Sequence, residues 1–364
     1  MSDGKAVRFN ARMSMSTPKA GVSWSLFALR YIDCSTANAA NPTPLDLRAA
    51  LEYPAGTFWP ATWPNNSQEI ALSPGEPVES LMLPVTIPAG ARFWVRVYGI
   101  VPAGGRWPLT SVLCDSTTGS GQEEGNSLPD KTRSGSIPNV GTAYSFLPPL
   151  AVTAEPADPA GCAAIGILGD SIAVGANDSS RTEYRGFAQR ALANRWGWIN
   201  LAEAGYALGS YSNTALRQWR WHAMPGLTHV FTNLGTNDLG AGAALGIMQT
   251  NLRTIAHSLD GLGIRLIPAT LAPRTNAGNS GPRASDPAAA WATRRSYNAW
   301  LRGNPTGHGF VDLAAVTESG ATGLWRTDLG PPSTDGIHPG PALHTAMRDQ
   351  LLAALTLLLA PQPS

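Results

Sequence analysis

Two short stretches, far apart in the chain, carry the side chains that nucleophilic catalysis by serine requires. An apolar run, Ile165–Leu168, leads directly into Gly169-Asp170-Ser171, so a serine lies in the turn after an expected strand. Far downstream, Asp335 precedes His338 by three residues in a glycine-containing loop. A serine hydroxyl is a weak nucleophile until a base accepts its proton, and an imidazole oriented by a carboxylate is such a base. The two stretches therefore predict a triad of Ser171, His338 and Asp335.

Two further stretches offer groups that could stabilise an oxyanion. Gly205 follows an expected strand, and Asn237 lies in a Gly-x-Asn-Asp sequence after the strand-like run His229–Leu234. Glycine lets the backbone approach a substrate closely, and asparagine brings N–H donors without a charge. Losing one fixed donor beside a tetrahedral oxyanion costs roughly 3–4 kcal/mol. Gly209 follows the same strand as Gly205 and is the alternative donor.

In this order, the Gly-Asp-Ser turn, the later glycine, Gly-x-Asn-Asp and Asp-x-x-His resemble the sequence blocks of the SGNH (GDSL) hydrolase family. Each block alone is typical of an ordinary turn, and their joint occurrence over roughly residues 160 to 360 favours the family. The resemblance implies Ser171 as nucleophile, His338 as general base and then acid, and Asp335 as the group that orients the imidazole. It also implies an oxyanion hole made by the backbone N–H groups of Ser171 and Gly205 and the side chain of Asn237.

The activity that this resemblance implies is that of a serine esterase. We expect short-chain acyl esters as substrates, acetyl esters foremost, either small esters or acetylated carbohydrates. Arg274, Trp325 and Arg326 lie in loops after a strand or before the histidine and are candidate substrate contacts, although ordinary surface placement is the simpler interpretation. The alternative from another class is a non-catalytic carbohydrate-binding or structural protein with a degenerate hydrolase domain, and the intact set of site residues argues against it.

Composition and missing motifs exclude several other functions. The chain has 26 Lys+Arg and 25 Asp+Glu. A net charge of +1 gives no excess of positive charge that would indicate nucleic-acid binding. No Cys-x-x-Cys and no His-x-x-x-His with a glutamate occur, so no metal is expected. The chain lacks a dinucleotide fingerprint and a Walker motif, so no cofactor is expected either. A Gly-x-Ser-x-Gly elbow is also missing, which argues against an ordinary α/β-hydrolase lipase.

No compartment can be assigned from the sequence. The first residues form no apolar signal segment, and the apolar run Leu351–Ala360 is too short to cross a bilayer. Three cysteines, Cys34, Cys114 and Cys162, cannot all pair with one another. A cytoplasmic chain, export by a route without a signal peptide, and a phage-associated setting all remain open, and the oligomeric state is not predicted.

The length of 364 residues allows two domains, which we place at 1–158 and 159–364. The first is expected to be β-rich, a β-sandwich or jelly-roll-like fold, because apolar and polar residues alternate in segments separated by Pro-Gly turns. Its expected strands are 22–31, 80–87 and 91–99, and residues 115–143 are expected to form a long loop or hairpin. The second is expected to be a three-layer α/β/α fold with a parallel sheet. Its expected helices are 184–195, 244–259, 287–301 and 341–359, with a further strand at 264–269.

The N-terminal domain is also rich in tryptophan. Five of the 12 tryptophans precede residue 115, namely Trp24, Trp59, Trp63, Trp94 and Trp107. Aromatic faces can stack on sugar rings, which would suit a carbohydrate-binding module, but filling a sandwich core is the more common use of tryptophan and is favoured here.

Overall fold

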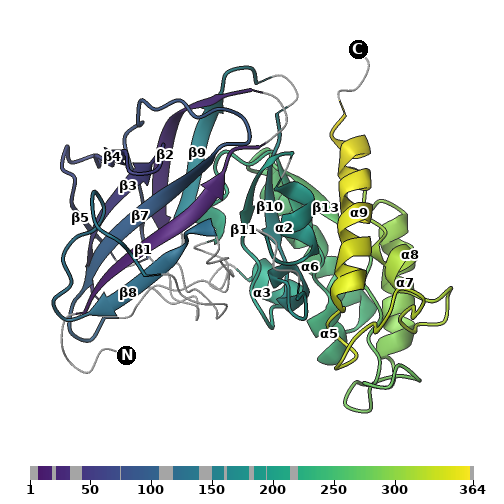
Figure 1. Ribbon diagram of the computed structural model, residues 1–364. Coiled ribbons are helices and arrows are strands. Elements are labelled where there is room, and N and C mark those ends of the chain that lie inside the picture. Colours follow the sequence, from purple (N-terminus) through teal and green to yellow (C-terminus); the bar gives the residue numbers. More distant parts are fainter. Residues whose placement is uncertain are drawn as a thin grey trace. The chain divides into compact units, whose positions relative to one another are not determined.

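The chain forms two compact units (Figure 1). A computed structural model describes residues 7–18, 22–32, 43–73, 75–105, 118–138, 150–159, 162–179, 184–193, 195–213 and 220–360. The first unit comprises Met1–Cys162 and Gln218–Gly226, and the second comprises Ala163–Arg217 and Leu227–Ser364. Nothing in the sequence pattern predicts that Gln218–Gly226 belongs with the first unit. Cys34, Cys114 and Trp107 lie outside the described residues.

In the first unit, two antiparallel sheets share one apolar core. Phe27 from the smaller sheet meets Phe93 from the larger one edge to face, with ring centroids 5.5 Å apart. This confirms the expected β-rich domain; a jelly-roll-like connectivity stays a prediction. The larger sheet has the order β4-β3-β7-β1-β8 with β5 beside β3, and the smaller one the order β6-β2-β9. The strands are β1 (Val7–Ser16), β2 (Trp24–Ile32), β3 (Leu45–Glu52), β4 (Phe58–Pro60), β5 (Ile70–Leu72), β6 (Pro77–Glu79), β7 (Arg92–Val101), β8 (Gly121–Gly125) and β9 (Leu150–Pro156).

One expectation for this unit needs correction. The segment Ser80–Ile87 is not a strand: it makes only isolated bridges, Leu83 with Phe27 and Ile87 with Trp24. Pro84 lies between these bridges and has no N–H to give to a ladder, which explains the interruption. In the segment 115–143, expected to be a long loop or hairpin, Gly121–Gly125 forms the strand β8, which pairs with β1.

A buried ion cluster lies on the face of the larger sheet that points away from the core. Glu52, which is 2% exposed, accepts from the Nε atoms of Arg12 at 2.8 Å and Arg96 at 2.7 Å. Burial alone would raise the pKa of Glu52, but the hydrogen bonds from the two guanidinium groups outweigh it and lower this pKa to about 2. The carboxylate is therefore ionised over most of the pH scale.

Glu52→Gln should lower the free energy of unfolding by about 3–5 kcal/mol, because two partly buried guanidinium groups would lose their counter-charge. Since the folded pKa lies below the unfolded one, the stabilisation by Glu52 is fully present above a pH of about 4.5 and is lost as the pH falls toward 2. Urea unfolding at pH 7 and pH 3 measures both effects. Glu124→Gln, at an exposed position of β8, is the matched control and should change stability little.

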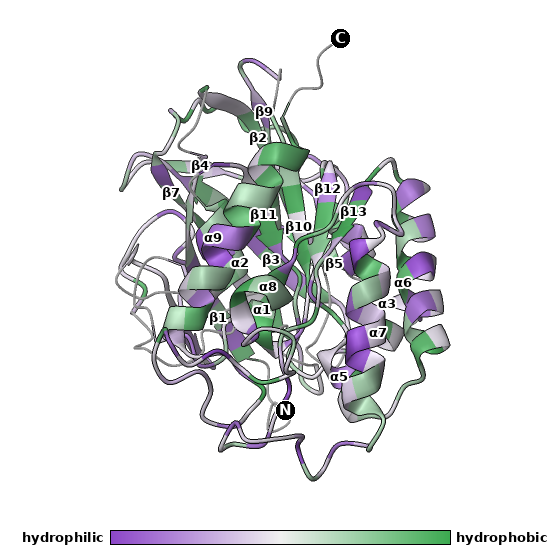
Figure 2. Cartoon of the chain, turned by 90° about the vertical axis from the view of Figure 1, so that its right-hand side faces the viewer, coloured by the Kyte–Doolittle hydropathy of each residue, from purple (hydrophilic) through white to green (hydrophobic). Residues whose placement is uncertain are grey.

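The second unit is built on a parallel sheet of order β11-β10-β12-β13. Its strands are apolar, as expected for a sheet covered on both faces (Figure 2). Helices α2 and α8 pack on α9, whereas α3 and α7 pack on α6. This confirms the expected SGNH-type α/β/α fold. The elements are β10 (Ala164–Leu168), β11 (Gly197–Asn200), β12 (His229–Thr232), β13 (Arg265–Pro268), α1 (Ser171–Val174), α2 (Phe187–Leu192), α3 (Leu208–Ser212), α5 (Thr236–Gly240), α6 (Leu245–Asp260), α7 (Ala290–Arg302), α8 (Leu313–Thr317) and α9 (Pro341–Leu358).

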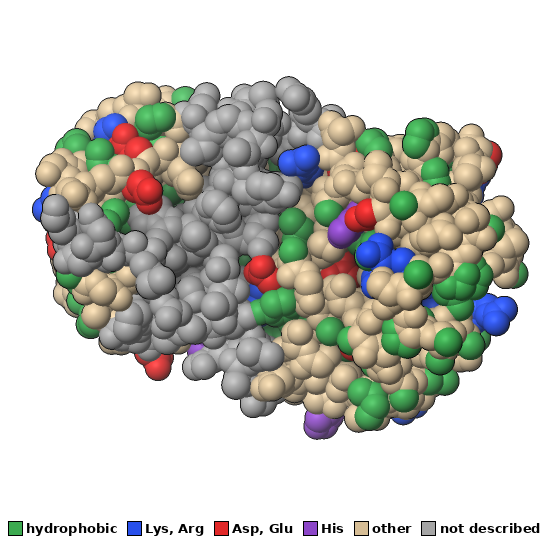
Figure 3. All heavy atoms as spheres, turned by 90° about the horizontal axis from the view of Figure 1, so that it is seen from below, with side chains coloured by type: hydrophobic (Ala, Val, Ile, Leu, Met, Phe, Trp, Pro, Cys, Tyr) green, Lys and Arg blue, Asp and Glu red, His purple; other side chains and the backbone are tan. Residues whose placement is uncertain are grey.

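The long helices agree with the sequence pattern, whereas α2 is shorter than expected. It begins at Phe187 because Gly186 before it has a left-handed φ of 80°. None of the described helices combines the length and the hydropathy needed to cross a bilayer. On the face drawn in Figure 3, positive and negative side chains are scattered among the described residues, and neither sign forms an extended patch.

Candidate active site

Ser171 lies where a buried strand turns sharply into a helix. The strand β10 ends at Leu168, and Ser171 is the first residue of α1. Asp170 caps this helix, since its carboxylate accepts from the backbone N–H of Ile172 at 2.9 Å. A Cβ atom on Gly169 would lie 2.4 Å from the Cβ atom of Ala173, so only glycine fits the turn. Gly169 and the Asp170 cap therefore shape the turn that places Ser171 at the start of α1.

The Asp335–His338 loop meets this turn. Ser171 Oγ lies 2.7 Å from His338 Nε2, and His338 Nδ1 lies 2.6 Å from Asp335 Oδ2. An ionised carboxylate can only accept hydrogen bonds, so Nδ1 carries the ring proton and Nε2 is left to accept the proton of the serine hydroxyl. The three side chains that the sequence singles out are thus joined in one hydrogen-bonded line.

Asp335 is held in its ionised form. Burial would raise its pKa, but hydrogen bonds from the backbone N–H groups of His338 and Ile337, together with the imidazole, hold this pKa well below its usual range. Both N–H groups donate to Oδ1 at 2.9 Å, which leaves Oδ2 for the imidazole. The carboxylate therefore has one oxygen for the loop and one for His338.

Neighbouring segments hold the Asp335–His338 loop in place. Arg283 donates to the backbone carbonyl of Asp335 at 2.7 Å, and the indole N–H of Trp325 donates to that of Gly336 at 3.1 Å. Gly336 has a φ of 80°, and a Cβ atom there would lie 2.0 Å from the carbonyl oxygen of Thr275. Arg283 and Thr275 have no recognisable signal in the sequence, because their contacts form only in the folded chain.

Gly205 and Asn237 lie together near the serine turn. The backbone N–H of Glu203 donates to the carbonyl of Gly169 at 3.0 Å, which brings the chain before Gly205 alongside the turn. Asn237 Nδ2 donates to the carbonyl of Tyr206 at 2.8 Å, so α5 and the residue after Gly205 are joined. That nitrogen carries a second hydrogen, which is available to an oxyanion.

The carboxylate of Asp238 bears on the choice between Gly205 and Gly209. It is buried and accepts from the backbone N–H of Leu208 at 2.9 Å and from that of Gly209. An N–H that is already bound to a carboxylate is a poor donor for a substrate. Gly205 has a φ of 82°, and the space at its Cβ position is open. This difference favours Gly205 as the oxyanion donor, which remains a proposal.

Asn237→Ala should lower kcat by about 10²–10³-fold and leave KM nearly unchanged, because the lost donor acts on charge that develops only in the transition state. Steady-state hydrolysis of a chromogenic acetyl ester measures both constants. Asn251→Ala, a change of the same kind on α6, is the control. Equal losses in the two variants would remove Asn237 from the oxyanion hole.

Asp170 and Asn233 form a buried pair beneath the serine. Asn233 Nδ2 donates to Asp170 Oδ1 at 3.0 Å. The remaining side-chain oxygens, Asp170 Oδ2 and Asn233 Oδ1, are buried and have no hydrogen-bond partner among the described residues. Burial raises the pKa of Asp170 to about 6, although the hydrogen bonds from Ile172 and Asn233 oppose this rise. A protonated Asp170 would supply the donor that this pair lacks.

Asp170→Asn should make the free energy of unfolding depend less on pH. Because the folded pKa of Asp170 is raised, its contribution to stability is present below a pH of about 4 and is lost as the pH rises through about 6. At pH 8 the variant should be more stable than the wild type by up to about 3 kcal/mol. Denaturant unfolding at pH 5 and pH 8 tests this, with exposed Asp349→Asn as control. A variant that is less stable at pH 8 would contradict it.

The three expected substrate contacts are either buried or paired with an acidic side chain. Trp325 is 1% exposed and covered by protein, so it supports the histidine loop rather than facing a substrate. Arg274 is paired with buried Asp286 at 2.8 Å and packs against Gly240 at the end of α5. Arg326 pairs with Asp328 at the surface. Burial and ion pairing of this kind cannot be read from the sequence. Among the described residues, no group of His, Cys, Asp and Glu could hold a metal ion.

The comparison with family models decides the classification. The model of the GDSL-like lipase/acylhydrolase family matches residues 167–346. These residues belong to that family. The match spans Ser171, Asp335 and His338, and it places this GDSL domain among the carboxylic ester hydrolases.

Several solved structures resemble part of this chain. A psychrotrophic esterase from Pseudoalteromonas sp. is 21% identical, with 54% of this chain and 99% of that chain covered and a TM-score of 0.39. A GDSL-like lipase from Bacteroides thetaiotaomicron VPI-5482 is 16% identical, with 54% and 87% covered and a TM-score of 0.40. A member of the lipolytic G-D-S-L family from Veillonella parvula DSM 2008 is 18% identical, with 53% and 98% covered and a TM-score of 0.40. No curated protein matches the chain.

Proposed function

We propose that this chain is a serine esterase that hydrolyses short-chain acyl esters, acetyl esters foremost, through an acyl-enzyme on Ser171. The observation that carries the proposal is the hydrogen-bonded line from Ser171 Oγ through His338 to Asp335, with distances of 2.7 and 2.6 Å. Such a line gives a hydroxyl its base and gives that base its orientation. The family match supports ester hydrolysis in general.

Each residue has a defined part in the proposed reaction. Ser171 Oγ attacks the ester carbonyl while His338 Nε2 accepts its proton, and Asp335 stabilises the imidazolium that results. The C–O bond to the alcohol then breaks, and His338 returns the proton to the leaving oxygen. Water attacks the acyl-serine in the same manner, and the acid is released. The N–H groups of Ser171, Gly205 and Asn237 would stabilise the oxyanion of both tetrahedral intermediates.

The surroundings of the triad favour a short acyl chain and a polar alcohol. The side chains of His338 and Asp335 are 24% and 41% exposed, so the triad lies at the surface of its unit. Nearby groups are polar: Asn177 donates to Thr334 Oγ1 and to the carbonyl of His338. A long acyl chain gains affinity mainly by burying apolar area, at about 25 cal/mol per Å². A polar, exposed site of this kind should therefore bind an acetylated sugar better than an ester with a long acyl chain.

Hydrolysis of p-nitrophenyl acetate, butyrate and octanoate, with glucose pentaacetate as a sugar ester, tests this proposal. We expect kcat/KM to fall at least about tenfold from acetate to octanoate, and acetate to be released from the sugar ester. Ser171→Ala is the control for background hydrolysis. Octanoate as the best substrate would refute the short-chain specificity, and no turnover beyond Ser171→Ala on any ester would favour a non-catalytic binding protein.

A further inference from the structure

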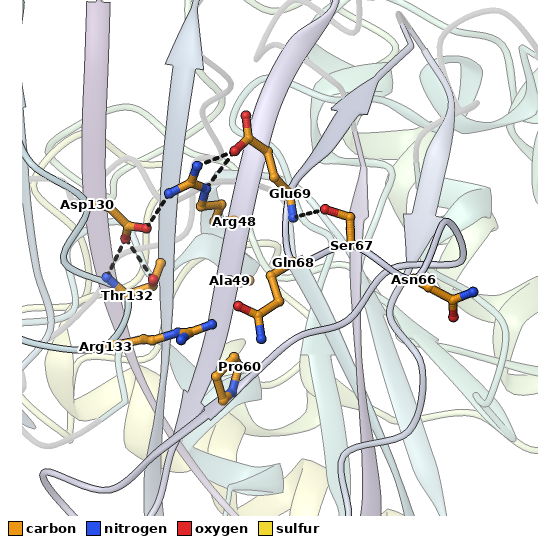
Figure 4. Close-up of a pocket in the computed structure, with 10 residues that line it drawn as sticks. All are labelled: Arg48, Ala49, Pro60, Asn66, Ser67, Gln68, Glu69, Asp130, Thr132 and Arg133. Atoms are coloured by element: carbon orange, nitrogen blue, oxygen red, sulfur yellow. Dashed lines mark hydrogen bonds and ion pairs between the residues drawn. The ribbon is translucent and has the colours of Figure 1, made fainter.

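A polar pocket of about 680 Å³ lies in the first unit and shares no residue with the Ser171 site (Figure 4). Its volume falls within the range of roughly 300–1,000 Å³ that is usual for small-molecule sites. The lining comes from β3, from the end of β4 and from two loops, 66–69 and 130–133. The lining residues are Arg48, Ala49, Pro60, Asn66, Ser67, Gln68, Glu69, Asp130, Thr132 and Arg133.

One side of the pocket is a fixed network of charges. Arg48 donates to Glu69 Oε2 from Nε at 2.9 Å and to Asp130 Oδ2 from Nη1 at 3.1 Å. The other oxygen of Asp130 accepts from the backbone N–H and the hydroxyl of Thr132. The hydrogen bond with Glu69 raises the pKa of Arg48 more than burial lowers it, so this guanidinium stays charged. Arg48 and its two carboxylates therefore form one connected network with a net charge of −1, in which the guanidinium is already engaged by both acids.

The other side carries polar groups that the protein itself leaves unused. Within the described part of the chain, the side chains of Arg133, Gln68 and Asn66 make no hydrogen bond or ion pair, and all three are exposed. Figure 4 shows the Arg133 guanidinium pointing toward Gln68 and Pro60. Ser67 Oγ accepts from the N–H of Glu69, so its own hydroxyl hydrogen is free to donate. These groups amount to one cation and several neutral hydrogen-bonding groups.

We propose that this pocket binds a saccharide that bears a carboxylate, such as a uronic acid residue. Its carboxylate would pair with Arg133, whose planar guanidinium suits two parallel hydrogen bonds. Its hydroxyls would bond to the amides of Gln68 and Asn66 and to the hydroxyl of Ser67. A simple anion would use only Arg133, and a neutral sugar would use only the neutral groups, whereas an acidic saccharide can bond to both.

Recognition here depends on charge and hydrogen bonds, because the lining contains no aromatic side chain. The four described tryptophans before residue 115 are all at least partly covered by protein. Trp63 is fully buried, and Trp24 and Trp59 pack against the core. Trp94 lies beneath Arg12, whose guanidinium carbon is 4.1 Å from the ring centroid. Packing of these four tryptophans within the unit agrees with the core-filling use favoured from the sequence, and the proposed recognition does not rely on them.

Calorimetric titration of the full chain tests the proposal independently of catalysis, with Ser171→Ala used to prevent turnover. We expect digalacturonate to bind with a Kd of about 0.1–1 mM, and galactobiose and succinate to bind at least about tenfold more weakly. Arg133→Gln should weaken digalacturonate binding about tenfold and change its salt dependence, as the loss of a charged hydrogen bond implies.

Two controls make the outcome decisive. Arg295→Gln makes the same change at an exposed position of the second unit and should bind digalacturonate normally. Thermal unfolding of Arg133→Gln should match the wild type, because the exposed side chain makes no hydrogen bond or ion pair with the described residues. No digalacturonate binding below about 10 mM, equal binding of galactobiose or succinate, or full affinity in Arg133→Gln would each overturn the proposal.

Discussion

Replacing either Ser171 or His338 with alanine should lower kcat for p-nitrophenyl acetate by about 10⁵–10⁶-fold, and the double variant should lose no more than either single one. Ser171 Oγ and His338 Nε2 are 2.7 Å apart and act on the same proton. A base without a nucleophile, or a nucleophile without a base, does almost nothing. The effects of two such residues are therefore grossly non-additive, unlike those of independent sites.

The control for this experiment is His344→Gln, since His344 is a buried histidine on α9 that donates from Nε2 to the carbonyl of Ala176 at 2.9 Å. Its loss should affect stability far more than kcat of the folded fraction. Additive losses at Ser171 and His338, with a double variant several orders of magnitude below the singles, would mean that the two side chains do not share one step.

Asp335→Asn should lower kcat by about 10⁴-fold while the protein stays folded. The amide can still accept from the backbone N–H groups of Ile337 and His338 through its oxygen. Its nitrogen, however, would face His338 Nδ1 with a donor, which favours the ring tautomer whose Nε2 carries the proton. That tautomer cannot accept the proton of Ser171. Steady-state kinetics at pH 7 and circular dichroism of the variant measure the two parts of this prediction.

Asp328→Asn is the matched control, because Asp328 is an exposed aspartate in the preceding loop and pairs with Arg326, away from His338. It should keep nearly full activity. Turnover of Asp335→Asn within about tenfold of the wild type would show that the 2.6 Å contact with His338 has no catalytic part.

The sequence predicts the main elements and the site residues of the second unit better than the residues that hold the site in place. The apolar run before Ser171 and the periodic helix 244–259 correspond to β10 and α6, because strong local patterns decide such elements. Motif order led to Ser171, Asp335 and His338, and the structure places their side chains in hydrogen-bond contact. The catalytic parts assigned to them still await experiment.

What the sequence could not show depends on contacts between distant segments. Arg283 donates to the backbone carbonyl of Asp335, and Asn233 donates to Asp170. The partners in each pair are far apart in the sequence, and no sequence motif links them. Trp325 and Arg274 have the residue types of substrate contacts, and only the folded structure reveals that both side chains are buried. In the first unit, a single residue without an N–H, Pro84, turned an apolar strand pattern into isolated bridges.

Active-site labelling tests the central claim most directly. A fluorophosphonate reacts covalently with a serine hydroxyl only where a base activates it, and intact-mass measurement followed by peptide mapping locates the adduct. We predict one adduct per chain, on Ser171, that forms in step with the loss of esterase activity. It should be missing in Ser171→Ala and slow in His338→Ala. An adduct on a different residue, or full inactivation with Ser171 unmodified, would contradict the account.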